Sequence, residues 1–326
     1  MKLRIPSHTL MTGRSSALPA LALFSLATMS AQGVSVLLDD NFTNAVRVGA
    51  TNARTGVDRD GVATLTNDWV MALNTTTAAT QTSDSNAPRV ATGINGNSLA
   101  VTNTGLAYSL STYFTPTTLA PGESISATFN VRTTGFTVLA LDTAFRFGLF
   151  DSNSGQLAAN SNFSGGAGSA IGTVFQDDRG YAAYYDTTTG ISTGTHEFRE
   201  RISAGAANNS NLFTPGQFST LVGGVTAASV FAIDTTYPVT ITIELASDGS
   251  AITTSSSFNG INLSLTDTPA TTTQFDHLSI FFGSQFGSAA TNGTQFIDDV
   301  NVTLVPEPGA ALLGGLGLLA LLRRRR

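Results

Sequence analysis

The sequence contains no cysteine among its 326 residues, and only 12% of them are charged. The lack of cysteine excludes disulfides, thiolate zinc sites, iron–sulfur clusters and cysteine nucleophiles. Lysine occurs once, as Lys2, so every other cationic side chain is an arginine. Charged residues reach about half of their usual share in a globular protein, and Thr, Ser, Asn and Gly take their place. We therefore expect an uncharged polar surface made of strands and turns.

The few charges are unevenly distributed along the chain. Lys2, Arg4 and Arg14 lie near the N-terminus, and four arginines end the chain. Between them, residues 33–304 hold nine arginines against 21 aspartates and glutamates, a net charge of −12. A body this acidic repels phosphate backbones, which argues against nucleic acid as a partner. Hydrophobic residues make up 41% of the chain, enough for a core without disulfides.

Residues 1–33 have the pattern of a secretory signal peptide. The three cations precede the apolar stretch ALPALALFSLATM, and the small residues of SAQG suit cleavage after Ala31 or Gly33. The apolar stretch is too short for a stable membrane span. We therefore expect residues 34–304 to be exported.

The chain ends in VPEPGAALLGGLGLLALLRRRR, residues 305–326. Its apolar part, 309–322, would be about 21 Å long as a helix, whereas a bilayer core of ~30 Å needs about 20 residues. Three glycines weaken this helix further, and the arginines would hold its end on the cytoplasmic side. We expect a short C-terminal membrane helix that pauses in the bilayer, with an extended Pro-Glu-Pro tripeptide just outside it.

This arrangement closely resembles the PEP-CTERM sorting signal of bacteria that make extracellular polymeric matrices. The resemblance implies an exosortase-type membrane protease as a partner, transient contact with the inner membrane, and a location in the cell envelope, on the cell surface or in the extracellular matrix of a Gram-negative-type bacterium. It implies nothing about activity, because such tails occur on many unrelated bodies. The sorting motif comprises Val305, Pro306, Glu307 and Pro308, and the membrane-orienting cluster comprises Arg323, Arg324, Arg325 and Arg326.

Period-2 alternation dominates residues 34–304 and predicts an all-β domain. The stretch VTITIEL, for example, alternates apolar and polar residues, and it precedes Asp248-Gly249, a hairpin signal. Neither a proline-rich linker nor an internal repeat interrupts the pattern. We therefore expect one β-sandwich or jelly roll of ten or more strands. The alternating apolar positions include Ile125, Ala127, Phe129 and Val131, then Phe145, Phe147 and Leu149, and Val239, Ile241, Ile243 and Leu245.

The first strand pattern, VSVLLDDNFTN, and the last, FIDDVNVTLV, both combine paired aspartates with apolar residues. With FRFGLFDS and DDRGYAAYYD between them, they resemble the concanavalin A-like lectin/glucanase sandwiches. The resemblance implies that the first and last strands lie side by side in one sheet. If they do, Asp39, Asp40, Asp298 and Asp299 could converge on a structural calcium ion. The alternative is that they are ordinary acidic residues at strand entrances; no other cofactor is predicted.

Patterns typical of catalysis are few. Laminarinase-type glycosidases on such a sandwich use two carboxylates on one strand face, and no Glu-x-Asp-x-Glu occurs. In HEFRE, Glu197 and Glu200 are three residues apart, which puts them on opposite faces of a strand. Once the signal peptide leaves, His196 and His277 are the remaining histidines, so a three-histidine metal site is excluded. His277 alternates with core positions, which favours a structural role over a Ser-His-Asp triad.

The stretch QDDRGYAAYYD contains the candidate glycan-binding residues Asp178, Arg179, Tyr181 and Tyr185. Aromatic faces stack on sugar rings, and Arg with Asp can bind hydroxyls. On a strand, Tyr181 and Tyr185 share one face and Tyr184 takes the other. The alternative is that these tyrosines pack on neighbouring strands. We expect an exported, non-catalytic protein that binds extracellular polysaccharide or acts structurally; the second hypothesis is a polysaccharide hydrolase or lyase that uses Glu197, Glu200 or the tyrosines.

Overall fold

The structure is a computed structural model, and the residues that it describes lie in one compact unit, Gln32–Arg326. The predicted signal peptide, apart from Gly33, and the predicted tail beyond Glu307 lie outside the described residues. Within the described part, no helix is long and apolar enough to cross a membrane. The described residues are 33–43, 69–73, 88–103, 105–135, 143–153, 155–157, 161–162, 174–187, 194–202, 212–213, 218–221, 224–227, 232–284 and 293–307.

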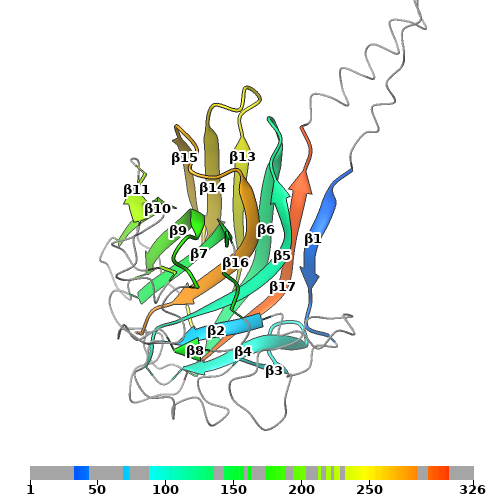
Figure 1. Cartoon of the computed structure of the whole chain (residues 1–326). Coiled ribbons are helices and arrows are strands. Elements are labelled where there is room, and N and C mark those ends of the chain that lie inside the picture. The colour runs from blue at the N-terminus through cyan, green and yellow to red at the C-terminus, as the bar shows by residue number, and fades with distance from the viewer. Residues whose placement is uncertain are drawn as a thin grey trace, which may run out of the picture. The chain divides into compact units, whose positions relative to one another are not determined.

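The described strands form two sheets, which confirms the predicted all-β sandwich (Figure 1). The eight-stranded sheet has the order β15-β14-β13-β6-β17-β4-β3, with β1 paired to β17. All of its pairings are antiparallel. Its strands are β1 (Ser35–Asp40), β3 (Arg89–Thr92), β4 (Asn97–Asn103), β6 (Ser124–Thr134), β13 (Thr236–Leu245), β14 (Ile252–Phe258), β15 (Ile261–Asp267) and β17 (Gly293–Val305).

The nine-stranded sheet has the order β11-β10-β9-β7-β16-β5-β2-β8, with β12 paired to β10. Its one parallel pairing is the two-residue contact of β2 with β8. Its strands are β2 (Trp69–Leu73), β5 (Tyr108–Thr118), β7 (Thr143–Asp151), β8 (Ser161–Asn162), β9 (Arg179–Thr187), β10 (Gly194–Arg201), β11 (Phe218–Thr220), β12 (Val225–Ala227) and β16 (Gln274–Phe282).

The alternation of apolar residues builds the core between the sheets. Along β6, Ile125, Ala127, Phe129 and Val131 are all buried, while the residues between them point outward. Each fully buried Ile or Phe side chain contributes about 1.5–3 kcal/mol. The predicted core positions on β7 and β13 belong to the same buried cluster. Period-2 patterning therefore predicted the inner faces correctly.

The first and last strands pair side by side, as the sequence resemblance implied. Strand β1 runs antiparallel to β17, with Ser35 opposite Leu304 and Asp40 opposite Val300. Strand β17 also pairs with β6 and β4, and its register with β6 shifts between Asp298 and Asn301. Asp299 in this bulge has a φ of 50°, in the left-handed region that Asp tolerates better than most residues.

A second apolar cluster covers the outer face of the nine-stranded sheet. Outward-facing residues of β2, β7, β9 and β16 pack there against segments 155–157, 174–178 and 212–213. Phe175 and Phe213 from these segments are fully buried. This face of the sandwich is therefore covered by connecting segments, and several buried polar side chains lie there, among them Asp178, Arg201 and His277.

Candidate functional site

Arg201, the last residue of β10, organises the covered face of the nine-stranded sheet. Its side chain is completely buried. Its guanidinium donates hydrogen bonds to three backbone carbonyls: those of Phe175, of Asp178 at 3.1 Å and of Leu212 at 2.8 Å. Burial lowers the pKa of Arg201 to about 10, although the charge of Asp178 opposes this shift. The arginine therefore stays charged at neutral pH and ties two connecting segments to the sheet.

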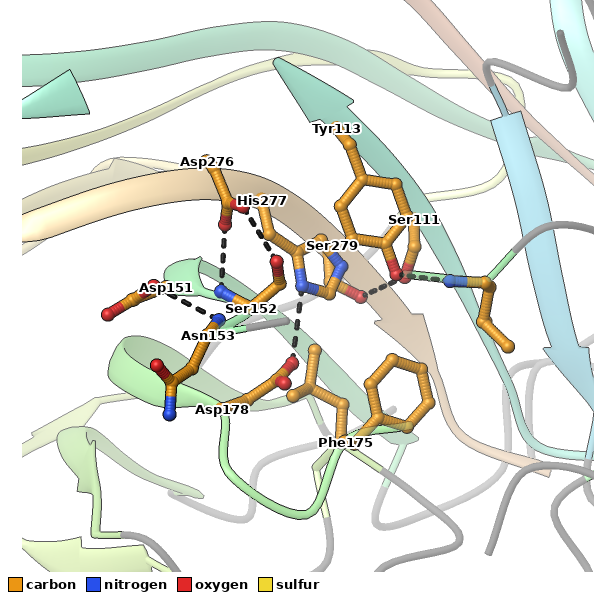
Figure 2. Close-up of polar contacts among 12 residues, drawn as sticks. Ser111, Tyr113, Asp151, Ser152, Asn153, Phe175, Asp178, Asp276, His277 and Ser279 are labelled. Atoms are coloured by element: carbon orange, nitrogen blue, oxygen red, sulfur yellow. Dashed lines mark hydrogen bonds and ion pairs between the residues drawn. The ribbon is translucent and has the colours of Figure 1, made fainter. Parts of the chain in front are cut away.

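Beside it lies a buried pair formed by Asp178 and His277 (Figure 2). Oδ2 of Asp178 is 3.4 Å from Nδ1 of His277, and neither side chain has exposed surface. The imidazole stacks between Tyr113, at a ring-centroid distance of 4.4 Å, and Phe175, at 6.1 Å. Burial raises the pKa of Asp178, while His277 and Arg201 act in the opposite direction.

Further hydrogen bonds fasten the segments around this pair, as Figure 2 shows. The hydroxyl of Tyr113 accepts a hydrogen bond from the backbone N–H of Leu157 at 3.1 Å. The carboxylate of Asp276 accepts two from Ser152, from its backbone N–H at 2.8 Å and from its hydroxyl at 2.6 Å. These contacts hold residues that follow β7 against strands β5 and β16.

This arrangement does not form a nucleophilic triad. Nε2 of His277, which would activate a serine, has no hydrogen-bond partner. The nearby hydroxyls of Ser111 and Ser279 bond to each other at 3.1 Å. The burial of His277 agrees with the core position that its alternation predicted. A catalytic group must be accessible to its substrate, and neither Asp178 nor His277 has exposed side-chain surface.

The predicted glycan-binding residues do not form an open site, which corrects that prediction. Tyr181, Tyr185 and Asp178 have no exposed surface, and Arg179 is the one exposed member of the four. The hydroxyl of Tyr181 donates to Asp267 at 2.7 Å, and the ring of Tyr185 stacks on Phe147 at 5.6 Å. Both rings are held between the sheets and present no face to a sugar.

Tyr184 takes the opposite face of β9, as predicted. Its ring lies in the outer apolar cluster, with the guanidinium carbons of Arg146 and Arg199 each 4.5 Å from its centroid. Arg199 also forms an ion pair with Glu197 on the same face of β10. The carboxylate of Glu197 is therefore paired with Arg199. Glu197 and Glu200 lie on opposite faces of β10, as their odd spacing predicted.

The four aspartates of the predicted calcium site do not converge, although their strands are adjacent. Among the described residues, no three His, Asp or Glu side chains form a group that could hold a metal ion. Asp40 instead accepts hydrogen bonds from the indole N–H of Trp69 at 2.8 Å and the backbone N–H of Phe42 at 3.0 Å. Strand pairing brings the backbones together but turns these carboxylates toward different protein donors.

Asp298 and Asp299 stabilise the bulge in β17. Asp298 is buried and accepts from the hydroxyl of Ser98 at 3.2 Å and from the backbone N–H of Asp299 at 3.0 Å. Asp299 is exposed and accepts from the side-chain amide of Asn130 at 2.9 Å. Protein donors supply the contacts that the calcium prediction assigned to a cation.

A pair of carboxyl groups that the sequence did not reveal links the two sheets at one edge. Glu200 of β10 and Asp267 of β15 lie close enough for their carboxyl groups to interact. Burial, followed by the charge of Asp267, raises the pKa of Glu200 to about 7. Tyr181, opposite Glu200 on β9, completes the contact through its bond to Asp267. The two acids lie 67 positions apart in the numbering, so no local motif signals the pair.

The fold and these buried clusters define an all-β sandwich protein. No family model and no curated protein matches the chain. Among solved structures, the chain is similar to lectin II from Ulex europaeus, with 12% identity, 83% of this chain and 99% of that chain covered, and a TM-score of 0.39. It is also similar to a legume lectin-like domain from Entamoeba histolytica, with 11% identity, coverage of 73% and 90%, and a TM-score of 0.40.

Replacing Arg201 by methionine should destabilise the protein strongly. The variant leaves three buried carbonyls without their donor, and we expect a loss of about 3–5 kcal/mol in the free energy of unfolding. Arg199→Met, on the same face but half-exposed, should cost about 1 kcal/mol or less. Urea unfolding of both variants measures the difference, and equal losses would contradict the role of Arg201.

Replacing Asp40 by alanine should also be costly. The indole N–H of Trp69 and the backbone N–H of Phe42 would lose a buried acceptor, so we expect a loss of about 2–4 kcal/mol. Asp39→Ala changes the exposed neighbour and should alter stability by less than about 0.5 kcal/mol. Thermal and urea unfolding test the contrast; the prediction fails if the two variants behave alike.

The Glu200–Asp267 pair should make stability fall as pH rises. A raised folded-state pKa means that the folded protein binds the Glu200 proton more tightly than the unfolded chain does. The stabilisation is complete below the ordinary glutamate pKa of 4.5 and is lost as pH rises through about 7. Glu200→Gln should flatten this slope in unfolding experiments between pH 4 and 8. Glu197→Gln, on the other face, should keep the wild-type slope, and a steeper slope in Glu200→Gln would refute the assignment.

Proposed function

We propose that this chain is an exported, non-catalytic protein that its tail, 305–326, directs to the bacterial cell envelope, cell surface or extracellular matrix, where its sandwich binds polysaccharide. The observation that carries the proposal is the position of the two ends of the body. Ser35 pairs with Leu304, so the chain enters and leaves the sandwich at one place. Strand β17 ends at Val305, immediately before Pro306. Removal of residues 1–33 and of the chain beyond Val305 would leave every described strand intact.

The acidic groups support a non-catalytic role. Retaining glycoside hydrolysis needs two carboxyl groups about 5–5.5 Å apart, and inverting hydrolysis needs a longer gap. Among the described acids, Glu197 is paired with Arg199, and Asp267 accepts a hydrogen bond from the hydroxyl of Tyr181. Tyrosine and histidine chemistry of the lyase type finds no support in the described residues either, because Tyr181, Tyr185 and His277 are buried.

The aromatic residues limit how a glycan could be bound. All six tyrosines and the one tryptophan lie within the described residues, and none of them is exposed. Polysaccharide binding by this body therefore has to use hydrogen bonds from polar side chains more than stacking on Tyr or Trp. This agrees with a composition that is rich in Thr, Ser and Asn and poor in charge.

Processing of the tail tests the sorting part of this proposal. In a producing bacterium with an exosortase-type membrane protease, intact-mass analysis should find a body that has lost the apolar segment 309–322 and the terminal arginines. A variant with alanine at positions 306, 307 and 308 should keep the whole tail and stay in the membrane fraction. Prolines favour an extended backbone, which is the form in which proteases bind chains.

A charge-conserving variant provides the control. Replacing Arg323, Arg324, Arg325 and Arg326 by lysines keeps the positive end on the cytoplasmic side and should leave processing unchanged. A wild-type protein that retains its tail at the cell surface, or an alanine variant that is still cleaved, would overturn the assignment of a sorting signal.

A further inference from the structure

The outer face of the eight-stranded sheet carries two complete rows of uncharged polar side chains. Each row crosses five neighbouring strands, from β17 through β6, β13 and β14 to β15, and each step is a registered antiparallel pair. The first row consists of Asn301, Thr128, Thr240, Ser257 and Asn262. The second row consists of Thr303, Ser126, Thr242, Ser255 and Ser264. We call these ten residues the uncharged face.

The geometry of this face is regular. The pairings β6–β13, β13–β14 and β14–β15 contain no register shift. Neighbouring strands are therefore about 4.8 Å apart and the two rows about 6.8 Å apart. Thr128, Asn262 and Ser264 are exposed, and the central residues are half-exposed. The hydroxyls of Ser126 and Thr242 bond to each other at 2.9 Å, which fixes their orientation before any ligand arrives.

Charged residues lie only at the borders of this face. Asp39 on β1 lies opposite Asn301 at one end of the first row. Glu244 lies two residues beyond Thr242 on β13. The body as a whole has a net charge of −12, and these ten neighbouring positions carry none of it. A charged polymer would find no counter-charge on the face.

The side-chain chemistry favours a polyhydroxylated partner over a protein. Protein interfaces depend on large anchors such as Trp, Tyr and Arg, and the uncharged face has none of these. Hydroxyl and amide groups both donate and accept hydrogen bonds. Short Ser and Thr side chains lose little conformational entropy when they are fixed, and a neutral group costs less to desolvate than a charged one. Each contact is weak, so a repeating polymer gains most from repeated rows.

We infer that the uncharged face is the surface on which this protein binds a neutral polysaccharide, laid across the strands of the eight-stranded sheet. This inference rests on the proposed function and assigns its binding surface. It places the ligand on the sheet opposite to the one that holds the buried Asp178–His277 pair. Binding uses hydrogen bonds from two parallel rows and needs neither a metal ion nor an aromatic platform.

Cosedimentation of the full chain with an insoluble neutral β-glucan tests the inference, with alginate gel as the anionic comparison. The wild-type protein should bind the β-glucan and not the alginate. Ser255→Glu places an unpaired charge inside the face, on β14, and should weaken binding at least about tenfold, because the charge must be desolvated. Ser255→Thr keeps the hydroxyl and should bind as the wild type does.

Matched variants separate the face from general effects of charge. Thr115→Glu adds the same charge at an exposed position on β5 of the other sheet and should leave binding unchanged. Asn262→Asp changes the charge of the face with almost no change in shape, so we expect it to fold as the wild type does and to lose binding. Its matched control is Asn41→Asp, an exposed position just after β1. Melting temperatures verify that each variant is folded.

Each contrary result has a distinct meaning. Unchanged β-glucan binding in Ser255→Glu and Asn262→Asp would overturn the assigned face while leaving polysaccharide binding intact. A correctly processed wild-type protein that binds no β-glucan, or that prefers alginate, would overturn the inference but not the sorting signal. Self-association that disappears in Ser255→Glu, without β-glucan binding, would make the face an interface between copies and also overturn it.

Discussion

The eight-stranded sheet depends on the pairing of its last strand. Strand β17 lies between β6 and β4 and is also the partner of β1. Without it, the strands β15-β14-β13-β6 and the pair β4-β3 would share no hydrogen bonds, and β1 would lose its partner. The sheet can therefore close only when residues 293–305 are available, and closing it requires contacts between the two ends of the body. A cut on the C-terminal side of Val305 spares this strand, whereas a cut before Gly293 would divide the sheet.

Buried polar groups stabilise the connections around this framework, in a chain that has no cysteine for disulfides. Asp40 holds the turn after β1, Asp298 holds the bulge in β17, and Arg201 holds two segments over the other sheet. Each of them satisfies backbone groups that would otherwise be buried without partners. The same hydrogen bonds make these side chains unsuitable as catalytic groups, because their donors and acceptors already bond to the protein and are not available to a substrate.

The sequence predicted the features that follow from local alternation. It identified the buried face of β6 and placed Glu197 and Glu200 on opposite faces of one strand. It also placed Tyr181 and Tyr185 on one face of β9 and Tyr184 on the other. These predictions succeeded because a strand alternates its side chains with period 2. It could not predict which faces are covered. Nothing in the local pattern distinguishes Arg201 from Arg199, yet one is fully buried beneath a loop and the other is half-exposed. The candidate glycan site failed for this reason: a tyrosine-rich strand looks the same whether its ring faces solvent or a second sheet.

The uncharged face and the core are two results of one alternation. Along β6, β13 and β14, most inward positions are apolar and most outward positions are Ser, Thr or Asn, and the register that aligns the core layers also aligns the outer rows. The two outer sheet faces then differ in kind. That of the nine-stranded sheet is apolar and is sealed by connecting segments, whereas that of the eight-stranded sheet is polar, regular and open at its described positions. A polymer-binding surface therefore needs no dedicated loop or motif here, because strand register alone generates a repeated array of hydrogen-bonding groups.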